Sequence, residues 1–204
     1  MSESTTIQYE RGDDGIVILT IDDPNQGANT MNRAYAESMA ATVERLEAEK
    51  DDIKGVIITS GKKTFFAGGD LNDLLAVTKE QAPEFAEGLR EIKGQLRRLE
   101  TLGVPVVAAV AGSALGGGLE ITLATHHRVV VDDPKIQLGT PEVSLGLLPG
   151  GGGVTRTVRM MGIANALLNV LIQGKPLRPA KALELGLISE LVDSPDDLIP
   201  AAKK

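Results

Sequence analysis

The stretch VPVVAAVAGSALGGGLE, residues 104–120, decides the fold. Its first half, residues 104–111, is an apolar run rich in valine and predicts a buried strand. Three consecutive glycines, Gly116 to Gly118, follow where a helix is expected to begin. Glycines at such a turn let backbone N–H groups approach a ligand closely, because no Cβ is in the way. The stretch predicts an α/β protein with either a binding turn or simply a tight turn after this strand.

The same alternation of apolar runs and helical patterns continues on both sides of this stretch. Further strands are predicted at 15–21, 53–59, 126–131, 136–138 and 188–192, and helices at 85–102, 156–162, 164–172, 180–186 and after the N-cap residue Asn32. The strand at 15–21 is expected to be buried on both faces. We expect residues 1–204 to form one α/β domain.

The composition excludes several classes of protein. The chain has no cysteine, which rules out disulfide scaffolds and thiolate chemistry, and only two histidines, His126 and His127, so no metal site is expected. A net charge of −7 and only three Phe and two Tyr argue against a nucleic-acid surface. The N-terminal segment lacks a secretory signal, and the uncharged stretch at 101–119 contains too much Gly and Pro for a spanning helix. We expect a cytoplasmic protein without a membrane span.

Two glutamates occupy apolar surroundings next to glycine turns. Glu120 follows the triple glycine by two residues, and Glu142 precedes the apolar run at 143–148. A buried carboxylate is costly unless it has a partner or a function, although either residue alone is explained as structural. Together with the glycine clusters at 68–69 and 150–153, they suggest an acid/base pair beside backbone donors that polarise a carbonyl group.

Three segments, in this order along the chain, resemble the crotonase (enoyl-CoA hydratase/isomerase) superfamily. They are TFFAGGDL at 64–71, AVAGSALGGGLE at 109–120 and PEVSLGLLPGGGG at 141–153. The sequence is most similar to the N-terminal hydratase part of the multifunctional fatty-acid β-oxidation α-subunit of actinobacterial type. The resemblance implies a crotonase-like spiral of ββα repeats, truncated at its C-terminus, because many members continue into further helices and the α-subunit into an NAD-dependent 3-hydroxyacyl-CoA dehydrogenase part.

The resemblance also implies roles for individual residues. The N–H groups of Gly69 and Gly117 match the oxyanion hole that holds the thioester oxygen. Glu120 and Glu142 match the two carboxylates that activate water and exchange a proton with the α-carbon of the substrate. The positions expected to bind substrate are Ala28, Met31, Lys63, Ala67, Gly68, Asp70, Gly116 and Gly150.

The implied activity is hydration of trans-2-enoyl-CoA, since isomerases of the family commonly keep only one of the two glutamates. The alternatives are a double-bond isomerase, an acyl-CoA-binding fragment that truncation has made inactive, and a generic anion-binding domain. No cofactor is expected, because CoA enters as the thioester substrate and NAD belongs to the dehydrogenase part. The implied partners are a thiolase subunit or further copies of the chain.

Two features stay outside this resemblance. His126 and His127 have no glycine-lined site of their own, and we expect them to be structural. Arg156 and Arg159 follow the last glycine cluster at helical spacing and serve either an anion site or only a helix surface.

Overall fold

The computed structural model describes residues 5–204, and at positions 71 and 72 it describes the backbone only. Residues 1–4, which belong to the segment expected to lack a secretory signal, lie outside the described residues. None of the helices in residues 5–204 has the length and apolarity needed to cross a bilayer.

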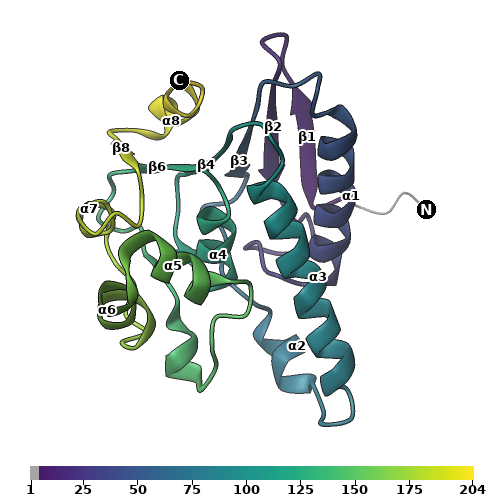
Figure 1. Ribbon diagram of the computed structural model, residues 1–204, viewed down its shortest axis with the longest axis vertical. Helices are drawn as coiled ribbons and strands as arrows, with labels where there is room; N and C mark the ends of the chain where they lie inside the picture. Colours follow the sequence, from purple (N-terminus) through teal and green to yellow (C-terminus); the bar gives the residue numbers. More distant parts are fainter. Residues whose placement is uncertain (1–4) are drawn as a thin grey trace.

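The chain builds one large sheet and one small one (Figure 1). The large sheet contains, in spatial order, β1 (Ile7–Arg11), β2 (Ile16–Ile21), β3 (Gly55–Ser60), β4 (Val106–Val110), β6 (His127–Val131) and β8 (Glu190–Val192). β1 is antiparallel to β2, and every other neighbouring pair in this sheet is parallel. The small sheet is a parallel pair, β5 (Ala114–Leu115) and β7 (Leu138–Gly139).

Helices follow the strands and cover the sheet. They are α1 (Arg33–Glu49), α2 (Leu71–Ala76), α3 (Ala82–Glu100), α4 (Gly117–Leu123), α5 (Gly153–Met161), α6 (Ile163–Ala166), α7 (Pro179–Glu184) and α8 (Pro195–Ala202), with a 3-10 turn η1 (Pro141–Leu145) and a π-helical turn η2 (Leu167–Leu171). Figure 1 shows α1 and α3 beside the N-terminal strands, and α5, α6 and α7 gathered on the other side of the molecule.

A repeating unit of strand, short strand and helix generates this arrangement. After β3, Phe66 pairs with Ala114 of the small sheet before α2 begins. After β4 comes β5 and then α4, and after β6 comes β7 and then η1 with α5. The second strand of each unit therefore joins a separate layer, which gives the predicted spiral of ββα repeats and brings the segments before the helices together.

Helix α1 begins as the sequence predicts. The Asn32 side chain accepts a hydrogen bond from the N–H of Tyr35 at 2.8 Å, which satisfies one of the free donors of the first turn. The buried face of α1 carries Tyr35, Met39 and Leu46, at the spacing that places residues on one side of a helix.

The predicted burial of the strand at 15–21 is wrong on one face. Val17, Leu19 and Ile21 are buried, but the alternate residues of β2 are half-buried, because that side of the sheet near its β1 edge is only partly covered. The sequence pattern also missed β1, α2 and α8. In β1 only Ile7 is buried, and α8, which begins with two aspartates, packs on β4 and β6 through buried residues such as Leu198.

Candidate active site

Two glycine clusters meet at one point, which we call the glycine junction and define by residues 67–69 and 115–117. The N–H of Met31 donates to the carbonyl oxygen of Gly68 at 2.8 Å, so the segment before α1 runs beside the loop after β3. Gly68 adopts a left-handed conformation with φ +98°, which favours glycine. A Cβ on Gly116 would lie 3.5 Å from the Cα of Gly68, so the two backbones are in close contact.

The junction carries two backbone donors without a partner. Within residues 5–204, neither the N–H of Gly69 nor that of Gly117 donates a hydrogen bond. A Cβ on Gly117 would approach the Cε of Met31 to 2.9 Å, and one on Gly69 would approach the Cδ1 of Leu74 to 3.2 Å. Because any larger residue would crowd this space, glycine keeps both N–H groups accessible to a ligand.

Glu120 is held rigidly beside this junction. It lies in the first turn of α4 and is only 2% exposed. Its Oε1 accepts a hydrogen bond of 2.7 Å from the N–H of Gly153, the first residue of α5. The positive end of the α5 dipole favours a negative charge there. A Cβ on Gly151 would lie 2.8 Å from the Oε2 of Glu120, so the glycine loop before α5 packs directly against the carboxylate.

Glu142 lies in a different setting, on the 3-10 turn η1. Its side chain is half-buried, and its Oε2 is buried without a hydrogen-bond partner among the described residues. A Cβ on Gly116 would lie 2.8 Å from its Oε1, so this carboxyl group is in contact with the glycine junction. Burial raises the pKa of Glu142 to about 7, and the negative charge of Glu120 contributes to the rise. At neutral pH, Glu142 therefore carries a proton for part of the time.

The other predicted positions gather around these groups, with one exception. Ala67, Gly68 and Gly116 belong to the junction, and Met31 pairs with it from the segment before α1. Asp70 follows the junction directly in the chain, and Ala28 precedes Asn29, whose carbonyl oxygen accepts the N–H of Ala67. A Cβ on Gly150 would lie 3.4 Å from the Cδ2 of Leu89, which places the glycine loop against α3. Lys63 is exposed on the turn after β3 and, among the described residues, is not part of the groove beside the junction.

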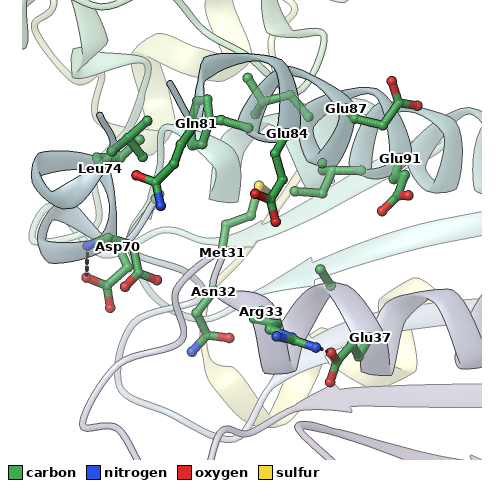
Figure 2. Close-up of a pocket in the computed structure, with 18 of the residues that line it drawn as sticks. Met31, Asn32, Arg33, Glu37, Asp70, Leu74, Gln81, Glu84, Glu87 and Glu91 are labelled. Carbon is green, nitrogen blue, oxygen red and sulfur yellow. Dashed lines mark hydrogen bonds and ion pairs between the residues drawn. The ribbon is translucent and has the colours of Figure 1, made fainter. Parts of the chain in front are cut away.

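A groove of about 700 Å³ leads away from the junction between α1 and α3 (Figure 2). Met31 and Gly69 lie where the groove and the junction meet, and Leu74, Phe85 and Leu89 add apolar lining. Its rim is acidic and includes Glu37, Asp70, Asp73, Glu84, Glu87 and Glu91. Figure 2 shows Glu84 pointing from α3 towards Met31, and the Arg33–Glu37 ion pair on α1 across from it.

Sequence reasoning missed this groove although it found the helix that lines it. The apolar stripe of α3 was predicted from its spacing, but only its C-terminal part, with Leu96 and Leu99, is buried in the core. Phe85 is 38% exposed, and Leu89 and Ile92 are half-buried. Helical spacing identifies an apolar face but does not tell whether a core or a groove covers it.

The two histidines lie away from the junction. His126 accepts a hydrogen bond from the N–H of Val106 on its Nδ1 at 2.9 Å, at the start of β4, and its Nε2 lies 3.2 Å from the carbonyl oxygen of Glu100. His127 pairs with Glu190 at 3.5 Å on the surface. His126 thus joins β4 to the end of α3, and a structural role for both histidines stays a prediction.

The family model described as enoyl-CoA hydratase/isomerase matches residues 11–203. The chain belongs to the enoyl-CoA hydratase/isomerase family. The match covers both glutamates and both unpartnered glycine donors. Family membership and the observed spiral confirm the crotonase resemblance of the sequence.

Curated relatives extend well beyond this chain. The "Fatty acid oxidation complex subunit alpha" of Shewanella frigidimarina is 43% identical over 194 residues, which are 94% of this chain and 27% of that relative. The protein of the same name from Idiomarina loihiensis is 42% identical over 193 residues, with the same two coverages of 94% and 27%. The chain thus spans about a quarter of the length of these relatives.

Solved structures share the fold. The crystal structure of enoyl-CoA hydratase from Bacillus anthracis superposes with a TM-score of 0.86 at 28% identity and covers 98% of this chain and 74% of that one. The enoyl-CoA hydratase from Thermoplasma volcanium gives a TM-score of 0.83 at 28% identity and covers 99% and 79%. The chain has the fold of these hydratases.

Proposed function

We propose that this chain adds water across the double bond of trans-2-enoyl-CoA thioesters to give 3-hydroxyacyl-CoA. The observation that carries the proposal is the contrast between two carboxyl groups beside one glycine junction, one held by a helix N-terminus and one with a pKa of about 7. Two carboxyl groups in different environments suit a reaction that needs both a base and an acid.

The thioester oxygen accepts hydrogen bonds from the N–H groups of Gly69 and Gly117. Electron density moves onto this oxygen as water attacks C3, so donors fixed in place stabilise the transition state more than the substrate. Loss of one such donor typically costs about 3 to 4 kcal/mol of activation free energy. This assignment is supported by the fact that neither N–H has a partner within residues 5–204.

Glu120 and Glu142 divide the proton transfers. Glu120 holds the water and accepts one of its protons while the oxygen bonds to C3, and its carboxylate is kept in place by Gly153. Glu142 delivers its proton to C2 from the carboxyl group that is partly protonated at neutral pH. The proton gained by Glu120 then replaces the one lost by Glu142, so the net change is the addition of one water.

The groove suits the acyl part of the substrate better than its CoA part. Its lining near Gly69 is apolar, whereas its rim carries six carboxylates and one arginine, which is already paired with Glu37. Acidic side chains repel the phosphates of CoA and leave an alkyl chain unaffected. We therefore place the acyl chain in the groove, with the thioester at the junction.

Cofactors, partners and location follow from the family resemblance. The steps above use only the side chains and backbone of the chain, and we expect neither a metal ion nor NAD to take part. A thiolase subunit and further copies of the chain are the proposed partners, since the relatives are named as subunits of a complex. We propose one hydratase domain over residues 1–204 and a cytoplasmic location.

The test is the loss of ultraviolet absorbance when crotonyl-CoA is mixed with the chain. We expect the absorbance to decay, and Glu120→Gln and Glu142→Gln each to slow the decay by about a thousandfold, within the range of general acid/base catalysis. Glu184→Gln, an exposed glutamate of α7, is the matched control and should leave the rate unchanged.

Three outcomes contradict the proposal. A decay that persists in both glutamate variants would assign the chemistry to other residues. Binding of crotonyl-CoA without any decay would make the chain an acyl-CoA-binding module. Conversion of a 3-enoyl thioester to the 2-enoyl isomer without hydration would make it an isomerase.

A further inference from the structure

A second hollow, of about 290 Å³, lies between α3 and α5, and we call it the basic hollow. Lys93 and Arg97 line it from α3, and Arg156 and Arg159 line it from α5. Among the residues that the structure describes, Glu100 is the only carboxylate that lines it. Four cations against one carboxylate give a positive site on a chain whose net charge is −7. A local excess of charge opposite to that of the whole molecule favours an anionic ligand.

Arg156 forms the inner wall of the basic hollow and is fixed there. Its side chain is only 10% exposed. Its Nη1 donates to the carbonyl oxygen of Gly151 at 3.0 Å, and its Nη2 lies 3.4 Å from the Oε2 of Glu100. Its Nε is buried and has no hydrogen-bond partner among the described residues. The contacts of Nη1 and Nη2 hold Arg156 in place, and it contributes a fixed positive charge to the inner wall of the hollow.

The backbone beneath Arg156 is adapted to this position. Gly152 has φ +106°, a conformation that favours glycine, and the guanidinium group of Arg156 occupies the space where a Cβ would stand. The guanidinium therefore lies directly over the first turn of α5. Its place is set by the fold and does not depend on a mobile surface rotamer.

The outer cations are not neutralised by the chain itself. Glu100 pairs with Arg97 at 2.7 Å and is shared with Arg156. Lys93 and Arg159 are exposed, and in residues 5–204 neither forms an ion pair. One carboxylate thus serves two arginines, while two further cations face the same hollow without a partner.

We propose that the basic hollow binds a phosphate-bearing anion. The exposed guanidinium of Arg159 presents parallel N–H donors that match phosphate oxygens, and the charges of Lys93 and Arg156 add affinity. Free inorganic phosphates and the phosphates of CoA share this chemistry. The site is separate from the glycine junction and from the acidic groove, and its existence does not depend on the proposed hydratase activity. Of the two roles that the sequence left open for Arg156 and Arg159, the proposal chooses the anion site.

Pyrophosphate titration of the ¹⁵N-labelled chain, followed by NMR at constant ionic strength, tests the proposal. We expect saturable shifts of the amide signals around Gly152 and Arg156. The double variant Lys93→Gln/Arg159→Gln, which changes only exposed side chains, should weaken binding by about tenfold or more. The matched control Arg178→Gln/Lys181→Gln removes the same two charges from exposed positions at α7 and should bind as the unmodified chain does.

A parallel titration with CoA distinguishes the sources of phosphate. Shifts at the same amides with both ligands, lost together in the Lys93/Arg159 variant, support a site for any diphosphate. If only CoA shifts these amide signals, the ligand of the basic hollow is the phosphate groups of CoA. The proposal is overturned if neither ligand gives saturable shifts there, or if the Lys93/Arg159 variant binds as tightly as the control.

Discussion

Glu120 and Glu142 are the same residue type beside the same junction, yet the fold treats them differently. Glu120 is buried in α4 and its carboxylate accepts an N–H from Gly153. Glu142 lies on a short 3-10 turn, half-buried, with one oxygen unpartnered. The N–H of Gly153 holds the Glu120 carboxylate in place, whereas burial raises the pKa of Glu142 to about 7. In the proposed mechanism, this difference in environment gives Glu120 the role of base and Glu142 the role of acid.

The largest expected effect concerns whether the two carboxyl groups act as a unit. The double variant Glu120→Gln/Glu142→Gln should hydrate crotonyl-CoA about as slowly as the slower single variant, because residues that act together have non-additive effects on rate. The comparison requires kcat/KM for the unmodified chain, both single variants and the double variant. If the two losses multiply, the residues contribute independently, and the division of roles proposed above is wrong.

A smaller effect is expected when each carboxyl group is displaced without being removed. Alanine at Gly151 would crowd Glu120, and alanine at Gly116 would crowd Glu142, since each new Cβ would lie 2.8 Å from a carboxyl oxygen. Each variant should lower kcat by about tenfold to a hundredfold, the usual cost of a displaced catalytic group. Gly116→Ala should also unfold more easily, because Gly116 has φ +53°.

Gly94→Ala on α3 is the control for this pair, because a Cβ there would meet nothing within 4 Å. Its rate should be unchanged and its stability slightly higher, since alanine favours helix. Full activity of Gly151→Ala would show that the packing around Glu120 does not position it for the reaction.

The contrast between the two glutamates also shows how much of the site can be predicted from the sequence. The valine-rich run and triple glycine were enough to predict β4 and the turn into α4, because strand and turn preferences are local. The family motifs located Glu120 and Glu142. The pKa of Glu142 was beyond prediction, since it depends on burial and on packing against Gly116, from which it is separated by α4, β6 and β7. Such contacts are set by long-range packing, and the amino-acid sequence of η1 alone does not reveal them.

The basic hollow shows the same limit. Arg156 and Arg159 were visible as a pair at helical spacing, but Lys93 and Arg97 come from another helix far back in the chain. Only the packing of α3 against the glycine loop of α5 brings the four cations together. The overall composition indicated an acidic surface, because a net excess of acidic residues does not reveal a local positive site.

The smallest expected effect is on stability as a function of pH. Below about pH 4.5 the carboxyl group of Glu142 is protonated in both states, and up to about pH 7 it ionises only in the unfolded chain. Its contribution to stability is therefore present at low pH and is lost as pH rises to about 7. Glu142→Gln should become more stable relative to the unmodified chain by about 1 kcal/mol across this range, reduced from the full linkage value by partial exposure.

Urea unfolding at pH 5 and pH 8 measures this difference, with Glu184→Gln as the control for the loss of one carboxylate. The control should show the same change with pH as the unmodified chain. An identical change in Glu142→Gln would mean that Glu142 titrates in the folded state as it does in the unfolded one.

The donors at the glycine junction belong to the backbone, and this has a genetic consequence. No exchange of one side chain for another deletes the N–H of Gly69 or Gly117, except a change to proline. Loss-of-function mutations in this part of the chain should therefore act by crowding neighbouring atoms. A Cβ on Gly117, for example, would lie only 2.9 Å from the Cε of Met31. In a saturation screen, damage at these two codons should increase with the volume of the new residue more than with its charge.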